Sequence, residues 1–329
     1  MATVNASTVS LSNSSQTQRT DSKASSYRSL LKVGVSACLA TCAAVTFSNP
    51  WEVVKTRLQL QGELTAKNAG LRPYNNSFSA LTIIFKTEGI RGLQKGLGPA
   101  YCYQVAMNGT RFTLYDPFKS FFNEILSSDD AMTTAVIAGA ASGVCAAAIS
   151  SPFYLVKTRM QSYSPTNAIG YQHHYKSTFS GLSQIFRQEG IRGLFRGVDA
   201  AMMRTSIGSA AQLSSYDKCK QAILKSPSFE DNVYTHCLAS MITSVFVCIV
   251  MNPFDVVSTR MYNQKANQAT GKGALYRNPI HCFVRTVYTE GVSGLYKGVL
   301  AHYLRIGPHT ILTFVFLEQI KGVMNRWFP

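Results

Sequence analysis

The stretch SSPFYLVKTR, residues 150–159, ends a long uncharged segment with a proline, a tyrosine and two cations. Its pattern occurs three times, as NPWEVVKTRLQLQ from residue 49, SPFYLVKTRMQ from 151 and NPFDVVSTRMYNQ from 252. A second element, EGIRGLQKG from residue 88, returns 101 residues later at 189 and again at 290. Acids at Asp116, Asp217 and Glu318 repeat with the same spacing. The chain is therefore built from three copies of one unit.

The composition favours a membrane protein over a nucleic-acid binder. The 329 residues are 46% apolar and only 15% charged, with a formal net charge of +16. Nucleic-acid binding needs Lys and Arg clustered with aromatic residues on one face, whereas here the cations are spread at regular intervals. Uncharged runs of 26, 23 and 19 residues precede Lys157, Asp255 and Glu52, respectively. A helix needs about 20 largely apolar residues to span a bilayer.

Each repeat has the same predicted order of elements. A long uncharged helix ends at the proline motif, a polar loop and a short amphipathic helix follow, and a second membrane helix comes after the Glu-Gly turn. The prediction is an all-α membrane protein of six transmembrane helices in three pseudo-three-fold repeats. The predicted spans are 30–59, 97–120, 131–160, 199–222, 233–262 and 299–323. Because Pro50, Pro152 and Pro253 lie inside helices and kink them, the three helices should converge on a constriction.

The expected domains follow the repeat. They are repeat 1 over 29–126, repeat 2 over 127–225 and repeat 3 over 226–329, after a disordered Ser/Thr-rich tail over 1–28. The eight cysteines show neither paired CxxC spacing nor zinc spacing, and most lie in apolar segments. We interpret them as packing residues, with no metal site and no disulfide framework.

With these motifs the chain resembles the mitochondrial carrier family over residues 30–323. The patterns P-x-[DE]-x-x-[KR]-x-R, Glu-Gly with a basic-Gly end, and [FY]-[DE]-x-x-[KR] each recur three times, with a few substitutions. The stretches at 305–319 and 209–217 resemble the oxoglutarate, dicarboxylate and oxaloacetate branch. The resemblance implies a monomeric six-helix barrel in the mitochondrial inner membrane, with both termini toward the intermembrane space. It also implies alternating access between a cytoplasmic gate and a matrix gate.

The candidate substrate site is built around arginines in the second helices. An ionisable residue inside a bilayer is costly and is a functional candidate by default. Arg204 and Arg305 each lie 13 residues before their helix's acid, about 20 Å along the helix. Two guanidiniums can clamp the two carboxylates of a dicarboxylate. Arg111 either adds a third positive charge or pairs with a neighbour. Family contact points match Arg204 with Thr205, Arg305, and Tyr103 with Gln104, while Asn108, Gln212 and His309 are candidate lining residues or ordinary packing residues.

The gate residues follow from the cyclic order that the resemblance implies. The cytoplasmic gate would pair Asp116 with Lys220, Asp217 with Lys321, and Glu318 with Lys119. The matrix gate would pair Glu52 with Lys157 and Asp255 with Lys55, braced by Gln59, Gln161 and Tyr262. Its third position departs from the family pattern, because Tyr154 replaces the acid and Ser258 the base. We therefore expect a matrix gate of two ion pairs, weaker than the cytoplasmic gate of three.

The remaining expectations concern ligands and activity. No nucleophile–base pair, phosphate loop or metal cluster is evident, so no enzymatic activity or cofactor is expected. The turns at Lys95-Gly96, Arg196-Gly197 and Lys297-Gly298 open helices, and the resemblance implies bound cardiolipin there. The expected function is transport of oxaloacetate or a related dicarboxylate or oxo-acid anion. The alternatives are malate, 2-oxoglutarate, malonate or sulfate transport, a proton-leak carrier of the uncoupling type, or a non-transporting receptor or scaffold.

Overall fold

The computed structural model describes residues 5–64, 73–126, 131–224, 232–265 and 273–327, and these form helices joined by short turns and loops. The long helices are α1 (Asn5–Leu60), α3 (Leu97–Leu126), α4 (Ala131–Ser162), α6 (Val198–Leu224), α7 (Val233–Asn263) and α9 (Val299–Trp327). The short helices are α2 (Ser77–Leu93), α5 (Thr178–Leu194) and α8 (Pro279–Glu290), and a 3₁₀ turn η1 (Val292–Tyr296) follows α8. The predicted all-α class and the predicted helix order are confirmed.

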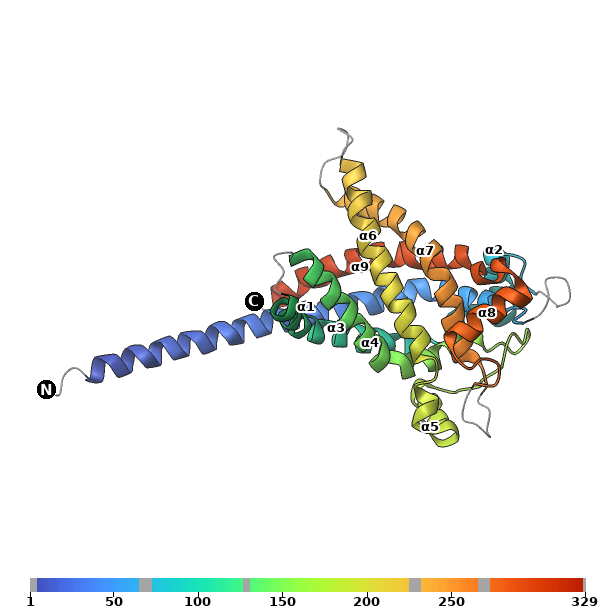
Figure 1. The fold of residues 1–329 in the computed structure, drawn as a ribbon, viewed down its shortest axis with the longest axis horizontal. Coiled ribbons are helices and arrows are strands. Elements are labelled where there is room, and N and C mark those ends of the chain that lie inside the picture. Colours follow the sequence, from blue (N-terminus) through green and yellow to red (C-terminus); the bar gives the residue numbers. More distant parts are fainter. Residues whose placement is uncertain (1–4, 65–72, 127–130, 225–231, 266–272, 328–329) are drawn as a thin grey trace.

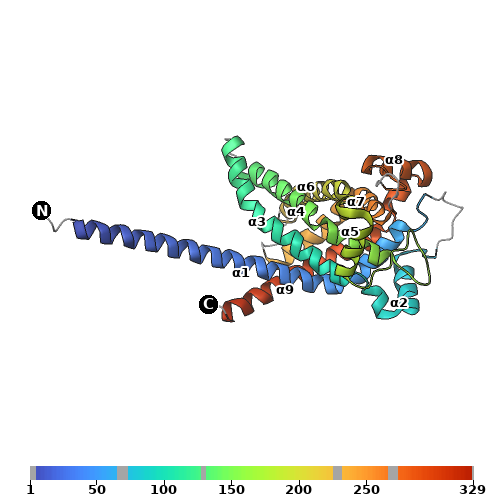
Figure 2. The same ribbon diagram turned by 90° about the horizontal axis from the view of Figure 1, so that it is seen from below.

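The six long helices form a closed ring that is wider at one end. Each second helix packs along the first helix of the next repeat: α3 along α4, α6 along α7, and α9 along α1 (Figure 1). We call the end that carries α2, α5 and α8 the narrow end, and the end that carries the C-terminal ends of α3, α6 and α9 the wide end. At the wide end the tips of the α3–α4 and α6–α7 pairs diverge from α1 and α9 (Figures 1 and 2).

The order of the ring is fixed by three glycines that open the second helices. Gly96, Gly197 and Gly298 have φ values of 73°, 80° and 74°, a left-handed conformation that favours glycine. A side chain at Gly96 would lie 2.8 Å from Gln161 of α4, and one at Gly197 would lie 3.3 Å from Met261 of α7. At Gly298 the nearest atom belongs to Leu58 of α1. Each repeat is thereby packed closely against the next.

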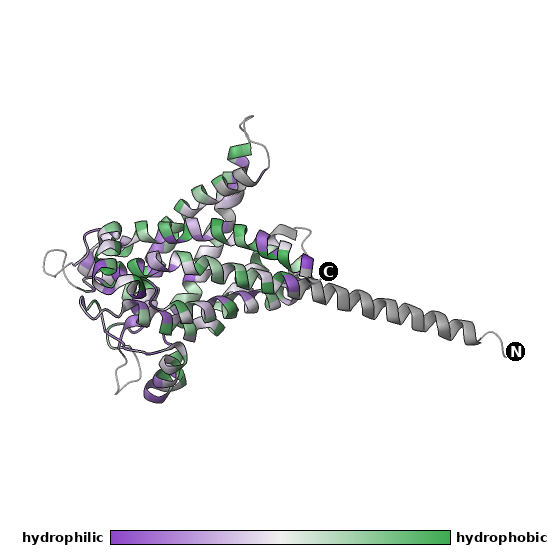
Figure 3. Ribbon diagram, turned by 180° about the vertical axis from the view of Figure 1, so that it is seen from behind, coloured by the Kyte–Doolittle hydropathy of each residue, from purple (hydrophilic) through white to green (hydrophobic). Residues whose placement is uncertain are grey.

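The short helices begin at the same kind of cap in all three repeats. Asn76, Ser177 and Asn278 each accept a hydrogen bond from the backbone N–H three residues later, which satisfies one free donor of the helix start. The outer faces of these helices carry large exposed apolar side chains, including Phe179 and Ile280. In Figure 3 green apolar segments occur along the long helices, whereas purple polar segments gather at the narrow end.

Hydropathy alone identifies three segments able to cross a membrane within the described residues: Lys32–Leu60, Thr133–Ser162 and Leu238–Asn263. These are the first helices of the three repeats. Hydropathy misses the second helices because each carries an arginine in the middle of its apolar run. The three-fold repeat predicts them as membrane spans instead. One prediction differs from the structure. Residues 5–28, expected as a disordered tail, continue α1, and the stretch from Asn5 to Val33 contains neither proline nor glycine to end a helix.

Candidate functional site

Two buried ion pairs join the first helices at the narrow end, counting only described side chains. Lys157 Nζ of α4 lies 2.7 Å from Glu52 Oε1 of α1, and Lys55 Nζ of α1 lies 2.6 Å from Asp255 Oδ2 of α7. None of these four side chains is more than 5% exposed. The pairs therefore close the narrow end of the ring, and they join the residues that the sequence assigned to the matrix gate.

The spacing of the proline motif explains how one helix serves two neighbours. Glu52 and Lys55 are three residues apart, so they lie on the same side of α1. The acid faces α4 and the lysine faces α7. In α4 the corresponding positions are Tyr154 and Lys157, and in α7 they are Asp255 and Ser258. The ring of pairs is thus complete on both sides of α1 and lacks its member between α4 and α7.

The predicted braces differ from one another in what they bind. Gln59 donates from Nε2 to Asp255 Oδ2 at 2.8 Å and accepts a bond from Thr259, so it supports the Lys55–Asp255 pair directly. Gln161 instead bonds Asn49 at 3.1 Å and accepts from Thr56, away from the pair. The third predicted brace, Tyr262, shares a 2.9 Å hydrogen bond with Ser151. Of these three described residues, Gln59 alone hydrogen-bonds a member of an ion pair.

The two candidate substrate arginines lie just inside the ion pairs. Arg204 Nη1 of α6 lies 3.9 Å from Asp255 Oδ1, and Arg305 Nη1 of α9 lies 3.6 Å from Glu52 Oε1. The side chains of Arg204 and Arg305 are 8% and 20% exposed. Their Nε atoms are buried without a hydrogen-bond partner among the described atoms. Each guanidinium therefore faces one carboxylate and keeps unused hydrogen-bonding capacity.

Other predicted site residues occupy the wall of the ring. Tyr103 accepts a 3.3 Å hydrogen bond from Arg204, so it shares that site. Arg111 lies 3.5 Å from the hydroxyl of Ser209, which is five residues beyond Arg204 on α6. Thr205 is buried, and its hydroxyl has no hydrogen-bond partner among the described atoms.

The three polar lining candidates are placed differently. Asn108 bonds Thr41 at 3.1 Å and His309 bonds Ser48 at 3.1 Å, which ties each to α1 and matches the packing interpretation. Gln212 is exposed. Gln104, the neighbour of Tyr103, is half-buried.

Below the ion pairs lies a second layer of charges that the sequence interpretation did not assign. Arg57 holds Glu88 at 2.5 Å, Arg159 holds Glu189 at 3.0 Å, and Arg260 holds Glu290 at 2.6 Å. The same arginines donate hydrogen bonds to backbone oxygens of the next repeat. Arg57 donates to Gln161 and Tyr163, Arg159 donates to Tyr262, and Arg260 donates to Gln59. Each arginine therefore links the Glu-Gly turn of its own repeat to the neighbouring first helix. The sequence does repeat these arginines and glutamates once in each of the three units, and this repetition could have marked them as structurally important.

The cations of the basic-Gly turns complete this layer. Lys95, Arg196 and Lys297 pair with Glu88, Glu189 and Glu290, and cardiolipin at these turns stays a prediction. Although burial opposes ionisation, hydrogen bonds from Arg57 and Lys95 hold the pKa of the Glu88 carboxyl at about 2. The pKa of Glu290 is lowered in the same way by Arg260 and Lys297. These acids are therefore ionised partners of buried arginines at neutral pH.

The wide end carries charges of the same type in another arrangement. Asp116, Glu318 and Lys321 are exposed and Lys119 is half-buried. No ion pair joins any two of these four, all of which lie in the described part of the chain. The side chain of Asp217 lies outside the described residues, so its predicted pairing with Lys321 is not placed. Asp116, Lys119, Glu318 and Lys321 thus stay apart while the narrow end is closed.

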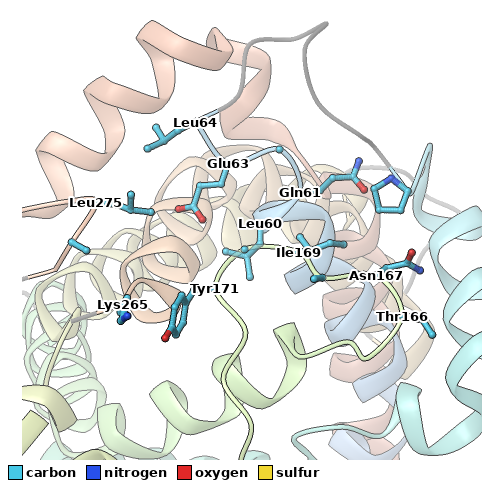
Figure 4. Close-up of a pocket in the computed structure, with 15 residues that line it drawn as sticks. Leu60, Gln61, Glu63, Leu64, Thr166, Asn167, Ile169, Tyr171, Lys265 and Leu275 are labelled. Atoms are coloured by element: carbon cyan, nitrogen blue, oxygen red, sulfur yellow. The ribbon is translucent and has the colours of Figure 1, made fainter. Parts of the chain in front are cut away.

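A pocket of about 810 Å³ lies away from the arginines, beyond the ion pairs at the narrow end, between residues 60–64 and 166–171 (Figure 4). Figure 4 shows Glu63, Lys265 and Tyr171 around it. Its lining includes residues that flank 65–72 and 266–272, which are outside the described ranges, and we assign no ligand to it. Over the described residues no cluster of three or more His, Cys, Asp or Glu side chains could hold a metal ion.

Comparison with known proteins adds the evolutionary setting. The sequence profile of the mitochondrial carrier protein family matches three segments, residues 26–126, 128–227 and 229–327. The mitochondrial oxaloacetate transport protein of Saccharomyces cerevisiae is 45% identical over 317 residues, which cover 94% of this chain and 95% of the relative. That of Schizosaccharomyces pombe is 46% identical over 89% of this chain and 91% of the relative. The mitochondrial citrate transporter E of Aspergillus niger is 44% identical over 88% and 92%.

Proposed function

This chain belongs to the mitochondrial carrier protein family, and we propose that it transports oxaloacetate or a related small dicarboxylate or oxo-acid anion by alternating access. The observation that carries the proposal is the pair Arg204 and Arg305. Each guanidinium already lies within 4 Å of a carboxylate, those of Asp255 and Glu52. These protein carboxylates occupy the kind of position that the carboxylates of a dicarboxylate would take.

The names of the relatives support the same substrate class. Two of them are oxaloacetate transport proteins and a third is a citrate transporter, so all three names refer to small anions with at least two carboxylates. A binding site built from guanidiniums suits such anions, because each arginine can donate two parallel hydrogen bonds to one carboxylate. Arg204 is buried and Arg305 is half-buried, and burial strengthens these bonds relative to the same bonds in water.

A tricarboxylate such as citrate is the second candidate. Arg111 lies against Ser209, about two turns along α3 from Tyr103, and would supply a third cation farther toward the wide end. We place it second because Arg111 makes no described contact with Arg204 or Arg305.

We further propose the location and state of the carrier. It spans the inner membrane as a monomer, with the narrow end toward the matrix and both termini toward the intermembrane space. Anionic lipid of the cardiolipin kind, which carries two phosphates, would bind the N-termini of α3, α6 and α9 rather than Lys95 or Lys297, which are already paired. A carrier of this kind needs no nucleophile, metal or prosthetic group, and we assign none.

Uptake by the purified protein in liposomes tests the proposal. Labelled oxaloacetate should accumulate at rates well above those of protein-free liposomes, and unlabelled oxaloacetate, malate, malonate, 2-oxoglutarate, sulfate and citrate should compete in an order that defines the substrate. Arg204→Ala and Arg305→Ala should abolish uptake, whereas Arg187→Ala, an exposed arginine of α5, should not. Uptake that is unchanged in both Arg204→Ala and Arg305→Ala, or a proton leak without anion uptake, would refute the proposal.

A further inference from the structure

The missing third ion pair at the narrow end is replaced by aromatic rings. The ring of Tyr154 lies 5.2 Å from that of Tyr103 and 5.0 Å from that of Tyr262, both within the range of favourable aromatic contacts. Ser258, which occupies the position of the missing base, is fully buried and its hydroxyl has no hydrogen-bond partner among the described atoms. The contact between α4 and α7 is therefore uncharged at this level.

Tyr154 does more than fill this space, because two cations rest on its ring. Arg204 Cζ lies 5.0 Å from the ring centroid and Lys157 Nζ lies 5.4 Å from it. The face of an aromatic ring attracts cations within about 6 Å, and more strongly where water is excluded. Tyr103 adds a 3.3 Å hydrogen bond to the same guanidinium. The orientation of Arg204 is thus set largely by two uncharged tyrosines.

The charges around Tyr154 at the narrow end show why an uncharged residue at this position matters. Among the described side chains, the cluster contains the cations Lys55, Lys157, Arg204 and Arg305 and the acids Glu52 and Asp255. Four positive charges against two negative charges leave an excess of two, which a dicarboxylate would neutralise. An acid at position 154 would lie where the ring now meets Arg204, and it would neutralise that guanidinium permanently.

We propose that Tyr154 is a positioning and specificity-determining residue of the substrate site. Its neutral ring holds Arg204 in place without neutralising it, so that the guanidinium stays available for a substrate carboxylate. This inference rests on the proposed transport of small dicarboxylates. It assigns the loss of the acid at position 154 a role in anion binding, in addition to its effect on the strength of the closed end.

The competing interpretation is that Tyr154 only plugs the narrow end together with Tyr262. A plug would affect the rate of transport and the stability of the protein, whereas a positioning residue affects the affinity for substrate. The two roles are separated by measuring KM and the maximal rate independently.

The experiment measures initial rates of labelled oxaloacetate uptake into liposomes for Tyr154→Phe, Tyr154→Leu and Tyr154→Asp. Phe keeps the ring and should keep KM within about twofold. Leu keeps the apolar contact but loses the cation–ring attraction, and should raise KM about tenfold. Asp should raise KM further and weaken competition by dicarboxylates more than competition by monocarboxylates. Tyr288→Leu, the same change at an exposed tyrosine of α8, is the matched control.

A second variant keeps the test independent of folding defects. In Tyr154→Asp with Ser258→Lys the new acid has its own basic partner, so KM should return toward the wild-type value even though the maximal rate falls. The inference is overturned if Tyr154→Leu changes only the maximal rate, or if Ser258→Lys does not rescue the KM of Tyr154→Asp. Absence of uptake by the wild-type protein would refute the proposed function instead.

Discussion

The narrow and wide ends of the ring carry similar charges in opposite arrangements. At the narrow end Glu52, Lys55, Lys157 and Asp255 are buried and paired within 2.7 Å. At the wide end Asp116 and Glu318 are exposed, and neither is in a described ion pair. The difference lies in how close the helices come, since both ends have acids and lysines three residues apart. Acids and lysines therefore form ion pairs at the narrow end, whereas Asp116 and Glu318 at the wide end do not.

We expect the two ends to act as alternating gates, and the energies of their ion pairs bear on how each would open. An exposed ion pair contributes only about 0–1 kcal/mol, so separated charges at the wide end cost little. Breaking a buried pair by removing one partner costs about 3–5 kcal/mol, because the remaining charge stays out of water. We therefore expect the closed end to open only when its charges are compensated. A dicarboxylate bound by Arg204 and Arg305 would add negative charge beside Lys55 and Lys157 and could take over part of the role of Asp255 and Glu52.

The largest expected effect comes from the two arginines that lie just inside the narrow-end ion pairs. Arg204→Ala or Arg305→Ala should lower the rate of oxaloacetate uptake about a hundredfold or more, because a buried charged partner of the substrate is lost. The measurement is initial uptake into liposomes at equal protein incorporation. Retention of more than a tenth of the wild-type rate in either variant would place the substrate elsewhere.

A matched pair of neutral substitutions tests the difference between the ends directly. Asp255→Asn leaves Lys55 buried without its carboxylate and should lower the Tm by about 6 °C or more. Asp116→Asn, at the exposed end, should change the Tm by less than about 2 °C. Thermal unfolding of the purified protein in detergent checks both values. Equal shifts would mean that the two ends are not energetically different.

Restoring the missing pair should strengthen the closed end. Tyr154→Asp with Ser258→Lys adds a third pair between α4 and α7, so the narrow end should open less readily and the maximal transport rate should fall about two- to fivefold. The Tm of this double variant should be equal to or above the wild-type value. An unchanged maximal rate would show that the number of pairs does not limit opening.

The smallest expected effect concerns a histidine in the loop between α4 and α5 at the narrow end. Burial, with the nearby charge of Arg159, lowers the pKa of His173 to about 3, and its Nε2 lies 3.1 Å from the carbonyl oxygen of Asn263. The unfolded chain takes up this proton near pH 6.5, so the contribution of His173 to stability is complete above pH 6.5 and declines as the pH falls toward 3. The Tm of the wild type should therefore fall between pH 7 and 5, and less so in His173→Gln. A Tm that falls more in His173→Gln than in the wild type over this pH range would contradict the expected contribution of His173.

Much of the fold could be predicted from the sequence because three copies repeat in register. The second helices fail a hydropathy test, but the repeat places them, and their predicted starts at 97, 199 and 299 differ from the observed starts by no more than one residue. The partners of Glu52 and Asp255 could also be predicted, because the cyclic order implied by the family assigns each acid to a lysine on a known neighbour.

Through-space details could not be predicted from spacing alone. Arg57 and Glu88 repeat as faithfully as the gate residues, but nothing in their spacing says that they meet, since a loop and a helix separate them. The choice of Glu290 over a lipid as partner of Lys297 depends on the packing of the Glu-Gly turn. The cation–ring contact of Tyr154 requires α4 and α6 to approach each other at one level, which only the folded ring fixes.

The most direct test of the difference between the two ends is the accessibility of two engineered cysteines. Ser209→Cys would lie beside Arg111 on the wall toward the wide end, and Ser258→Cys would lie fully buried at the ion-pair level. In a cysteine-free background in lipid nanodiscs, a charged thiol reagent should modify Ser209→Cys at least about ten times faster than Ser258→Cys when no substrate is present. Equal rates, or faster modification of Ser258→Cys, would contradict a carrier that is closed at its narrow end and open at its wide end.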